Sequence, residues 1–534
     1  MRHFLYTLAL LIGCCAALQA KSSTTNCVNP LTYTDIPDND VIRVGNDFYM
    51  ISTTMYFCPG APIMHSRDLV HWRIVSYVYD TLNDDDVYNL RNGRNAYGKG
   101  QWAASLRYHD GMFYVLFIAN DQQKTYVYKT RDIQHGTWEK TVLDRVFHDA
   151  SLLFDDGHVY LVYGNGDLRI AELKPDLSGV QPGGVDQVLI QAPRNGYGLR
   201  AEGAHFYHIG EYYYVLEIDW PSGGVRTETC WRSRSLLGPY ESKVVLQGAF
   251  DGRGDGVAQG AIFDTPAGDW YAVMFQDHGA VGRIPTLQPL TWEDGWPVLG
   301  DRTVPVKTFD VNLKPYGENY VWASDEFRSK RNQLALVWQW NHMPDDSAWS
   351  LTERKGWLRL RTAHVATSVM DARNSLTQRT VGPRCVSEVR MDVSGMKPGD
   401  RAGLCAFQSN YASIGVEMAS DGRKELVALT RAPGNGRRDG GAERITELLR
   451  KPLQNDVIYL KITYIFTPQS TGERADTAFL SYSEDGHTWH LVEGMLQMRY
   501  TLDLFTGYRS MLYNYATETT GGHVDFDYFR QAAF

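Results

Sequence analysis

The feature that most constrains the fold of this chain is a hairpin pattern that occurs five times. Each copy has an apolar strand, a turn containing Gly or Asp, and a second strand that opens on aromatic residues. The copies lie at residues 41–52, 106–117, 152–163, 205–216 and 262–273. Five repeats spaced about 45 to 65 residues apart predict the four-stranded blades of a five-bladed β-propeller.

Aligning the copies brings acidic residues to a single position. Counting back 11 residues from the aromatic residue after each turn gives Asp38, Ala103, Asp149, Glu202 and Gly260. This position opens the innermost strand of a blade, so residues far apart in the sequence meet at the central channel. One carboxylate there is explained by hydrogen bonding in a turn. Three like charges at one position carry an electrostatic cost, so we interpret them as a functional set.

Three grouped carboxylates suit the hydrolysis of a glycosidic bond. One carboxyl group protonates the leaving oxygen, and a second activates water when the two lie about 6.5–9.5 Å apart, which inverts the configuration. The width of a propeller channel favours this inverting arrangement. The acid must keep its proton, so its pKa has to rise from about 4.3 towards 6 or 7. A nearby carboxylate supplies part of that rise.

Length and charge restrict the remaining possibilities. A chain of 534 residues is too long for one ordinary core, so two domains are expected. The net charge of −9 argues against nucleic acid as a partner and favours a weakly charged ligand such as an oligo- or polysaccharide. Beyond residue 20, no apolar stretch has the roughly 20 residues that a membrane span needs.

Residues 1–20 are interpreted as an export signal, with a short basic start and an apolar run. Two processing outcomes stay open: a lipoprotein-type cleavage that leaves a lipid anchor on Cys14, and a cleavage after Ala20 that releases a soluble protein. The expected location is therefore the periplasm or the outer membrane, by lipid anchor. The five cysteines outside the signal are widely spaced and show no CxxC, which predicts scattered buried thiols.

Three segments resemble glycoside hydrolase family 43, in the same order. They are PDNDVIRVGNDFYMISTT (37–54), FHDASLLFDDG (147–157) and AEGAHFY (201–207). The resemblance implies an inverting five-bladed propeller that acts on arabinose- and xylose-containing polysaccharides. It makes Asp38 the general base, Asp149 the residue that adjusts the pKa, and Glu202 the general acid. The family usually has Pro after the base, and this chain has Asn39, so the orientation of Asp38 is less firmly implied.

Four further residues enter by the same resemblance. Arg283 is expected to contact the sugar and the pKa-adjusting carboxylate, and Trp102 to form an apolar wall for the sugar. Phe57 is expected to border the pocket. His278 is the candidate metal ligand, because some relatives hold a structural calcium ion near the channel axis. No cofactor is expected to be required for the reaction.

The C-terminal part predicts a different all-β domain. The propeller is expected over 29–312, the turn-rich segment 308–320 is interpreted as a linker, and a β-sandwich is expected over 323–534. Two of its segments, 334–362 and 520–528, resemble the concanavalin-like domain attached to some family 43 enzymes. There the sandwich packs on the propeller and narrows the active-site mouth. The alternative is a separate carbohydrate-binding module.

The predicted function is an exo-acting inverting glycoside hydrolase. The resemblance favours a non-reducing end α-L-arabinofuranosidase that acts on hemicellulose side chains of the arabinoxylan or xyloglucan type. The first alternative is a β-D-xylosidase (exo-1,4-β-xylosidase) on xylo-oligosaccharides, since the catalytic residues are shared. The second is a non-catalytic sugar-binding propeller, which would have no need of three carboxylates at one position.

Overall fold

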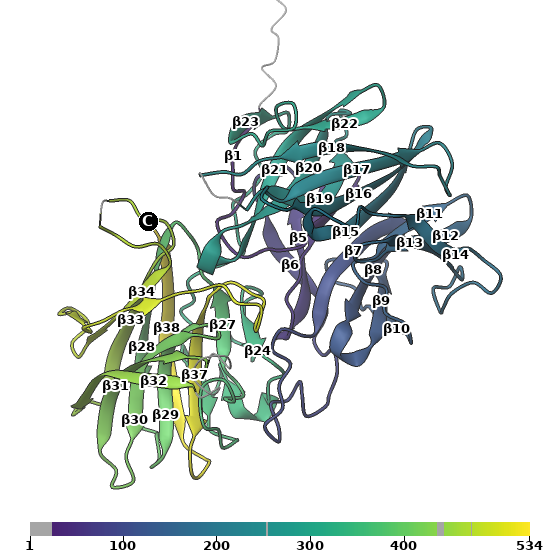
Figure 1. Cartoon of the computed structure of the whole chain (residues 1–534). Helices are drawn as coiled ribbons and strands as arrows, with labels where there is room; N and C mark the ends of the chain where they lie inside the picture. The colour runs from purple at the N-terminus through teal and green to yellow at the C-terminus, as the bar shows by residue number, and fades with distance from the viewer. Residues whose placement is uncertain (1–23, 252–254, 435–442, 471) are drawn as a thin grey trace, which may run out of the picture.

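The computed structural model describes residues 24–251, 255–434, 443–470 and 472–534. The expected signal and Cys14 lie outside the described residues. The described chain forms a propeller and a sandwich that lie side by side (Figure 1). No helix within these ranges is long and apolar enough to cross a membrane.

The propeller has five blades of four antiparallel strands each. Blade 1 contains β2 (Asp40–Val44), β3 (Asp47–Ile51), β5 (Gly60–Ser66) and β6 (Arg73–Tyr79). Blade 2 contains β7 (Gln101–His109), β8 (Met112–Ala119), β9 (Lys124–Thr130) and β10 (Glu139–Leu143). Blade 3 contains β11 (Ser151–Asp155), β12 (His158–Tyr163), β13 (Leu168–Leu173) and β14 (Asp186–Ile190). Blade 4 contains β15 (Tyr197–Ile209), β16 (Tyr212–Pro221), β17 (Thr227–Ser233) and β18 (Glu241–Gln247). Blade 5 contains β19 (Val257–Asp264), β20 (Trp270–Asp277), β21 (Arg283–Glu293) and β22 (Trp296–Leu299).

The five predicted hairpins are the first two strands of the five blades, so the propeller prediction is confirmed. The first strand of each blade contacts the first strand of the next, and the ring closes from β19 back to β2. The closure is supported by β1 (Thr25–Val28), which pairs antiparallel with β23 (Thr308–Val311). The expected linker therefore begins with a strand, which was not predicted because the four residues TFDV are too few for their alternation to indicate one.

The C-terminal domain is a sandwich of two sheets, as predicted. One sheet has the order β32 (Arg444–Pro452), β31 (Lys424–Ala432), β30 (Tyr411–Met418), β29 (Asp400–Phe407), β37 (Arg509–Ala516), β27 (Leu376–Arg379), β24 (Gln339–Asn341), β4 (Phe57–Cys58). The other has the order β25 (Trp349–Ser350), β26 (Leu358–Arg361), β38 (His523–Ala533), β28 (Arg384–Asp392), β33 (Val457–Ile465), β34 (Thr477–Ser483), β35 (His490–Leu491), with β36 (Leu496–Gln497) also on β34. Apolar residues of both sheets form one core between them. The described helices are three short 3₁₀ turns, η1 (Asn120–Gln122), η2 (Gly279–Val281) and η3 (Asp346–Ala348).

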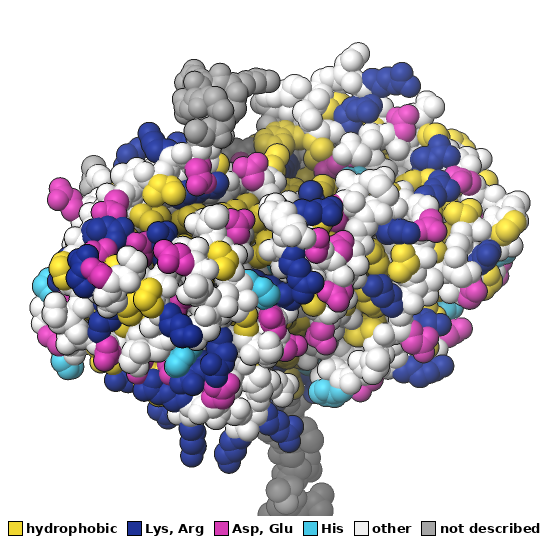
Figure 2. Space-filling model, turned by 90° about the horizontal axis from the view of Figure 1, so that it is seen from below, with side chains coloured by type: hydrophobic (Ala, Val, Ile, Leu, Met, Phe, Trp, Pro, Cys, Tyr) yellow, Lys and Arg dark blue, Asp and Glu magenta, His cyan; other side chains and the backbone are white. Residues whose placement is uncertain are grey.

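One strand belongs to both parts of the molecule. β4 lies in the propeller sequence between β3 and β5, but it pairs with β24 and completes a sheet of the sandwich. The two domains are therefore joined by main-chain hydrogen bonds as well as by side-chain packing. On the face shown in Figure 2, acidic and basic side chains are intermixed.

Candidate active site

A cavity of about 390 Å³ lies where the first strands of the blades meet. Its walls come from all five blades and from the sandwich. The main lining residues of the five blades, in order, are Asp38, Trp102, Asp149, Glu202 and Gln259. The cavity is at the small end of the roughly 300–1,000 Å³ range of small-molecule sites, which suits one or two sugar rings rather than a long chain.

The aligned position faces this cavity in four blades. Asp38, Ala103, Asp149 and Glu202 all line it, so the register derived from the repeats brings three carboxylates together. In blade 5 the aligned residue Gly260 is not in the lining. The register shifts between Ala258 and Gly260, and this irregularity turns Gln259 to the cavity instead.

Asp38 is buried, with 8% of its surface exposed, and has a positive φ of 53°. Arg283 Nη1 donates to Asp38 Oδ1 over 2.7 Å, and Gln259 Nε2 donates to the same oxygen over 3.4 Å. Burial raises the pKa of Asp38 above its ordinary value, although the positive charge of Arg283 opposes the rise. The turn before it is held by Asn39, whose Nδ2 donates to the Ile36 carbonyl over 2.9 Å. A side-chain bond thus stabilises the turn where relatives have Pro.

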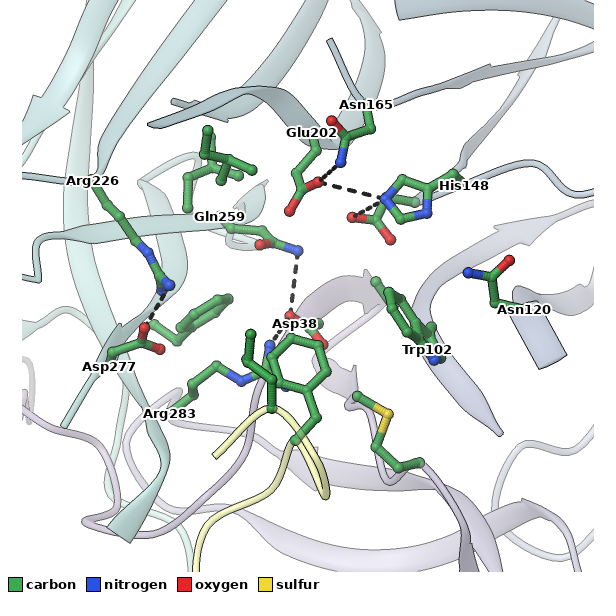
Figure 3. A pocket seen from close by; sticks show the side chains of 18 of the residues that line it. Asp38, Trp102, Asn120, His148, Asn165, Glu202, Arg226, Gln259, Asp277 and Arg283 are labelled. Carbon is green, nitrogen blue, oxygen red and sulfur yellow. Dashed lines mark hydrogen bonds and ion pairs between the residues drawn. The ribbon is translucent and has the colours of Figure 1, made fainter. Parts of the chain in front are cut away.

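Glu202 and His148 lie on the other side of the cavity from Asp38 (Figure 3). His148 Nε2 is near both Glu202 and Asp149, 3.5 Å from Glu202 Oε2 and 3.6 Å from Asp149 Oδ2. Burial, together with the charges of Glu202 and Asp38, raises the pKa of Asp149 to about 7, despite the opposing charge of His148. Asn165 donates to Glu202 Oε2.

The imidazole of His148 has an elevated affinity for a proton. Burial lowers its pKa, but the close contact with Glu202 and the charges of Asp149, Glu202 and Asp38 outweigh burial and raise the pKa to about 9. The sequence contains this histidine inside the FHDAS motif, but its role is not evident from the hairpin register because it lies one residue before the aligned position.

Arg283 is in the cavity, but its partner differs from the prediction. It pairs with Asp38, and among the described residues no hydrogen bond joins it to Asp149, the carboxylate it was expected to contact. Its guanidinium lies over the ring of Phe505, 4.6 Å from the centroid. Its Nε and Nη2 are buried and have no hydrogen-bond partner among the described protein atoms, so they are available to a ligand hydroxyl.

Of the two predicted aromatic residues, Trp102 lines the cavity and Phe57 does not. The ring of Trp102 packs edge-on against His148 and Phe505, with centroid distances of 6.0 and 5.8 Å. Phe57 is fully buried because β4 is drawn into the sandwich sheet, and Arg509 lies 4.2 Å above its ring. Met55, two residues earlier, occupies the cavity wall instead.

His278, the expected metal ligand, lies outside the cavity lining. Its Nε2 hydrogen-bonds to the hydroxyl of Tyr33, and the two rings meet edge-on. Among the described residues, the one group of His, Cys, Asp and Glu whose donor atoms lie close enough for a shared metal ion is His148, Asp149 and Glu202, within 4.8 Å.

Two parts of the cavity wall were not predicted. Arg226 and Asp277, from blades 4 and 5, form an ion pair of 2.5 Å beside Arg283 (Figure 3). They lie outside the aligned position, so the repeats give no signal for them.

The second unpredicted part is a segment of the sandwich that carries Tyr500, Leu502 and Phe505 into the cavity wall. It is anchored by Gly507 N, which donates to Asp35 Oδ2 over 2.9 Å, while Asp35 Oδ1 accepts from Arg283 N over 2.8 Å. The sandwich therefore packs on the propeller, as the resemblance implied, and supplies part of the cavity wall.

Comparison with known proteins agrees with this architecture. The sequence profile described as glycosyl hydrolases family 43 matches residues 27–297, and that of the beta xylosidase C-terminal concanavalin A-like domain matches 324–531. A beta-xylosidase of Formosa agariphila is 28% identical over 94% of this chain and 89% of its own length. A non-reducing end alpha-L-arabinofuranosidase of Bacteroides ovatus is 29% identical over 75% of this chain and 78% of its own length.

Among solved structures, a chain described as a bifunctional GH43-CE of Bacteroides eggerthii is 44% identical, with a TM-score of 0.87. The match covers 96% of this chain but 64% of that longer chain, which is less than two thirds of its length.

Proposed function

Because the chain belongs to glycoside hydrolase family 43, we propose that it removes terminal α-L-arabinofuranosyl residues from hemicellulose side chains as an exo-acting, inverting hydrolase. One observation carries the proposal: three carboxylates from separate blades face one small cavity, and Leu502 and Phe505 of the sandwich form part of its wall. A cavity of this size takes the end of a chain and excludes its middle.

The proposed mechanism assigns one role to each carboxylate. Glu202 donates a proton to the glycosidic oxygen as the bond to the anomeric carbon breaks. Asp38 accepts a proton from the water that attacks that carbon from the opposite face. Its φ of 53° and its bonds to Arg283 and Gln259 fix the direction of its carboxylate. Asp149 adds a negative charge beside Glu202, which favours the protonated form of the acid.

The ring of Trp102 and the free N–H groups of Arg283 support a role in holding the sugar. Aromatic faces pack against the apolar faces of sugars, and buried donors left without protein partners need a ligand to satisfy them. Arg283 forms an ion pair with Asp38, so an arginine that binds the sugar hydroxyls also fixes the position of the base relative to the sugar.

A β-D-xylosidase is the second candidate. The name of the Formosa agariphila relative and the description of the C-terminal profile both favour it, whereas the name of the Bacteroides ovatus relative favours arabinofuranoside hydrolysis. Both sugars are pentoses and require the same three carboxylates, so the choice depends on the shape of the cavity wall.

The test is hydrolysis of 4-nitrophenyl α-L-arabinofuranoside and 4-nitrophenyl β-D-xylopyranoside by residues 21–534. We expect a higher kcat/KM for the first substrate. Asp38→Asn is expected to lower kcat by about 10²–10⁴-fold on both, since it removes the base. Asp156→Asn, on an exposed hairpin turn, is the matched control and is expected to leave kcat/KM unchanged.

The stereochemistry follows from ¹H NMR of the first sugar released. Inversion gives the β-anomer of arabinose, and initial release of the α-anomer contradicts the mechanism. A higher kcat/KM for the xyloside makes the chain a xylosidase. Equal rates for the wild type and Asp38→Asn on every pentoside contradict the enzymatic proposal altogether.

A further inference from the structure

His148 occupies a position that the three-carboxylate mechanism leaves without a role. Its Nε2 lies 3.5 Å from Glu202 Oε2 and 3.6 Å from Asp149 Oδ2. Its carbonyl accepts a hydrogen bond from Gly164 N over 2.9 Å, and the edge-on ring of Trp102 supports the imidazole. The backbone and the ring contact therefore hold Nε2 toward the two acidic side chains.

The proposed reaction needs a proton at this place. After one turnover Glu202 has given its proton to the leaving group, and Asp38 has gained one from water. Glu202 must regain a proton before the next turnover. The side chains of His148 and Glu202 are 24% and 22% exposed, whereas Asp149 is 8% exposed, so His148 is the neighbour of Glu202 that can bring a proton from solvent when the sugar or product covers Glu202.

We propose that His148 and Glu202 share one proton, which lies on His148 Nε2 in the open cavity and on Glu202 Oε2 when a sugar fills it, and that His148 reloads Glu202 after each turnover. This inference rests on the proposed function above. His148 is thus a positioning residue that acts through the general acid.

The direction of the transfer follows from solvation. In the water-filled cavity the ion pair of imidazolium and carboxylate is well solvated. A bound sugar displaces that water, and the lower dielectric favours the neutral pair of imidazole and carboxylic acid. The acid then gives its proton to the glycosidic oxygen, which takes the electron pair of the breaking bond. Asp38 then releases to solvent the proton that it took from the attacking water. His148 takes a proton from solvent and passes it to the Glu202 carboxylate, so protons balance over the cycle.

The charges around His148 support a retained proton. Asp149 from the same segment, Glu202 from β15 and Asp38 ahead of β2 all face it, and all three are acidic. The cations Arg283 and Arg226 lie across the cavity (Figure 3), each against a carboxylate of its own. The raised pKa of His148, to about 9, agrees with a proton held in the His148–Glu202 pair throughout the neutral range.

The experiment compares pH profiles of kcat/KM for wild type, His148→Asn and His148→Gln. The substrate is an oligosaccharide with a sugar leaving group, of whichever pentose type the wild type hydrolyses. If the His148–Glu202 pair holds the proton, replacing His148 moves the alkaline limb of the kcat/KM profile to lower pH by about one unit or more. At pH 8 kcat/KM then falls at least about tenfold. If His148 only stabilises the Glu202 carboxylate, removing it makes Glu202 easier to protonate, and the limb moves to higher pH or stays in place. The second result overturns the inference.

A chemical rescue separates proton transfer from a merely structural effect. Imidazole in the buffer is expected to restore activity to His148→Ala in a concentration-dependent way, but not to Glu202→Ala. His135→Asn, an exposed histidine outside the cavity, is the control and is expected to keep the wild-type profile. Absence of rescue together with an unchanged profile contradicts the inference while leaving the proposed function intact. A wild type without activity on any pentoside overturns both.

Discussion

At the residue scale, the carboxylates of the cavity differ in their partners more than in their burial. Asp38 and Asp149 are equally exposed, at 8% each, yet Asp38 pairs with an arginine and Asp149 lies near a histidine and a second carboxylate. A fixed positive charge keeps Asp38 closer to its ionised form than burial alone would. This difference fits a base, Asp38, on one side of the cavity and the general acid, Glu202, with Asp149 beside it on the other.

Replacing Arg283 tests whether its positive charge lowers the pKa of Asp38. In Arg283→Gln the charge that lowers the pKa of Asp38 is gone, so the pKa rises further. The acidic limb of the kcat/KM profile is therefore expected to move to higher pH, and breaking a buried ion pair is expected to destabilise the fold by about 3–5 kcal/mol. pH-rate profiles and urea unfolding measure both effects.

Arg43→Gln is the matched control for Arg283→Gln. Arg43 forms an Arg–Asp pair with Asp264, but both side chains are partly exposed, at 27% and 37%. A surface pair of this kind contributes about 0–1 kcal/mol, so the pH profile is expected to stay unchanged. An acidic limb that does not move in Arg283→Gln contradicts the role given to the Arg283–Asp38 pair.

At the element scale, the first strands of the blades close the propeller ring, and residues in these strands or just before them line the cavity. The hairpin repeats predicted these strands and the position of three carboxylates, because alternation and turn residues are local signals. They did not predict Gln259, since a register irregularity in β19 depends on packing against β20. Nor did they predict that Phe57 would be buried in β4, because pairing with β24 depends on residues about 280 positions away.

Gly260 shows how tightly β19 is packed. A Cβ at this position would lie 1.8 Å from the Val273 carbonyl oxygen of β20. Gly260→Ala is therefore expected to push the two strands apart, to destabilise the chain by about 1–3 kcal/mol, and to lower activity by displacing Gln259. Gly179→Ala is the control, because nothing lies within 4 Å of its Cβ position. Equal melting temperatures of Gly260→Ala and Gly179→Ala contradict the conclusion that β19 has no room for a Cβ at position 260.

At the scale of the whole molecule, the cavity belongs to both domains. The sequence predicted a propeller and a sandwich but not the segment that joins them at the site, because Tyr500, Leu502 and Phe505 follow no repeat and match no catalytic pattern. Their position depends on long-range anchoring, through the bond from Gly507 to Asp35. Such contacts form only when distant parts of the chain have folded together, so a local sequence pattern cannot predict them.

Phe505→Ala tests the contribution of the sandwich to the site. Loss of the ring removes its contacts with Trp102 and Arg283, each worth about 0.5–1.5 kcal/mol. A fall of about tenfold in kcat/KM, mainly through a higher KM, is expected in steady-state kinetics. Phe534→Ala, whose side chain is 56% exposed at the end of the chain, is the control. Wild-type kinetics in Phe505→Ala contradict a role of the sandwich in binding.

The hydrogen bond between Gly507 and Asp35 also determines when the cavity can be completed during synthesis of the chain. The two residues are 472 positions apart, so a ribosome delivers one of them long before the other. At about 5–20 residues per second the interval is on the order of a minute. During that time the blades have room to close, but the cavity lacks the wall that the sandwich supplies. Until residues 500–505 have been synthesised, the carboxylates therefore lie in a cavity that lacks the side chains of Tyr500, Leu502 and Phe505.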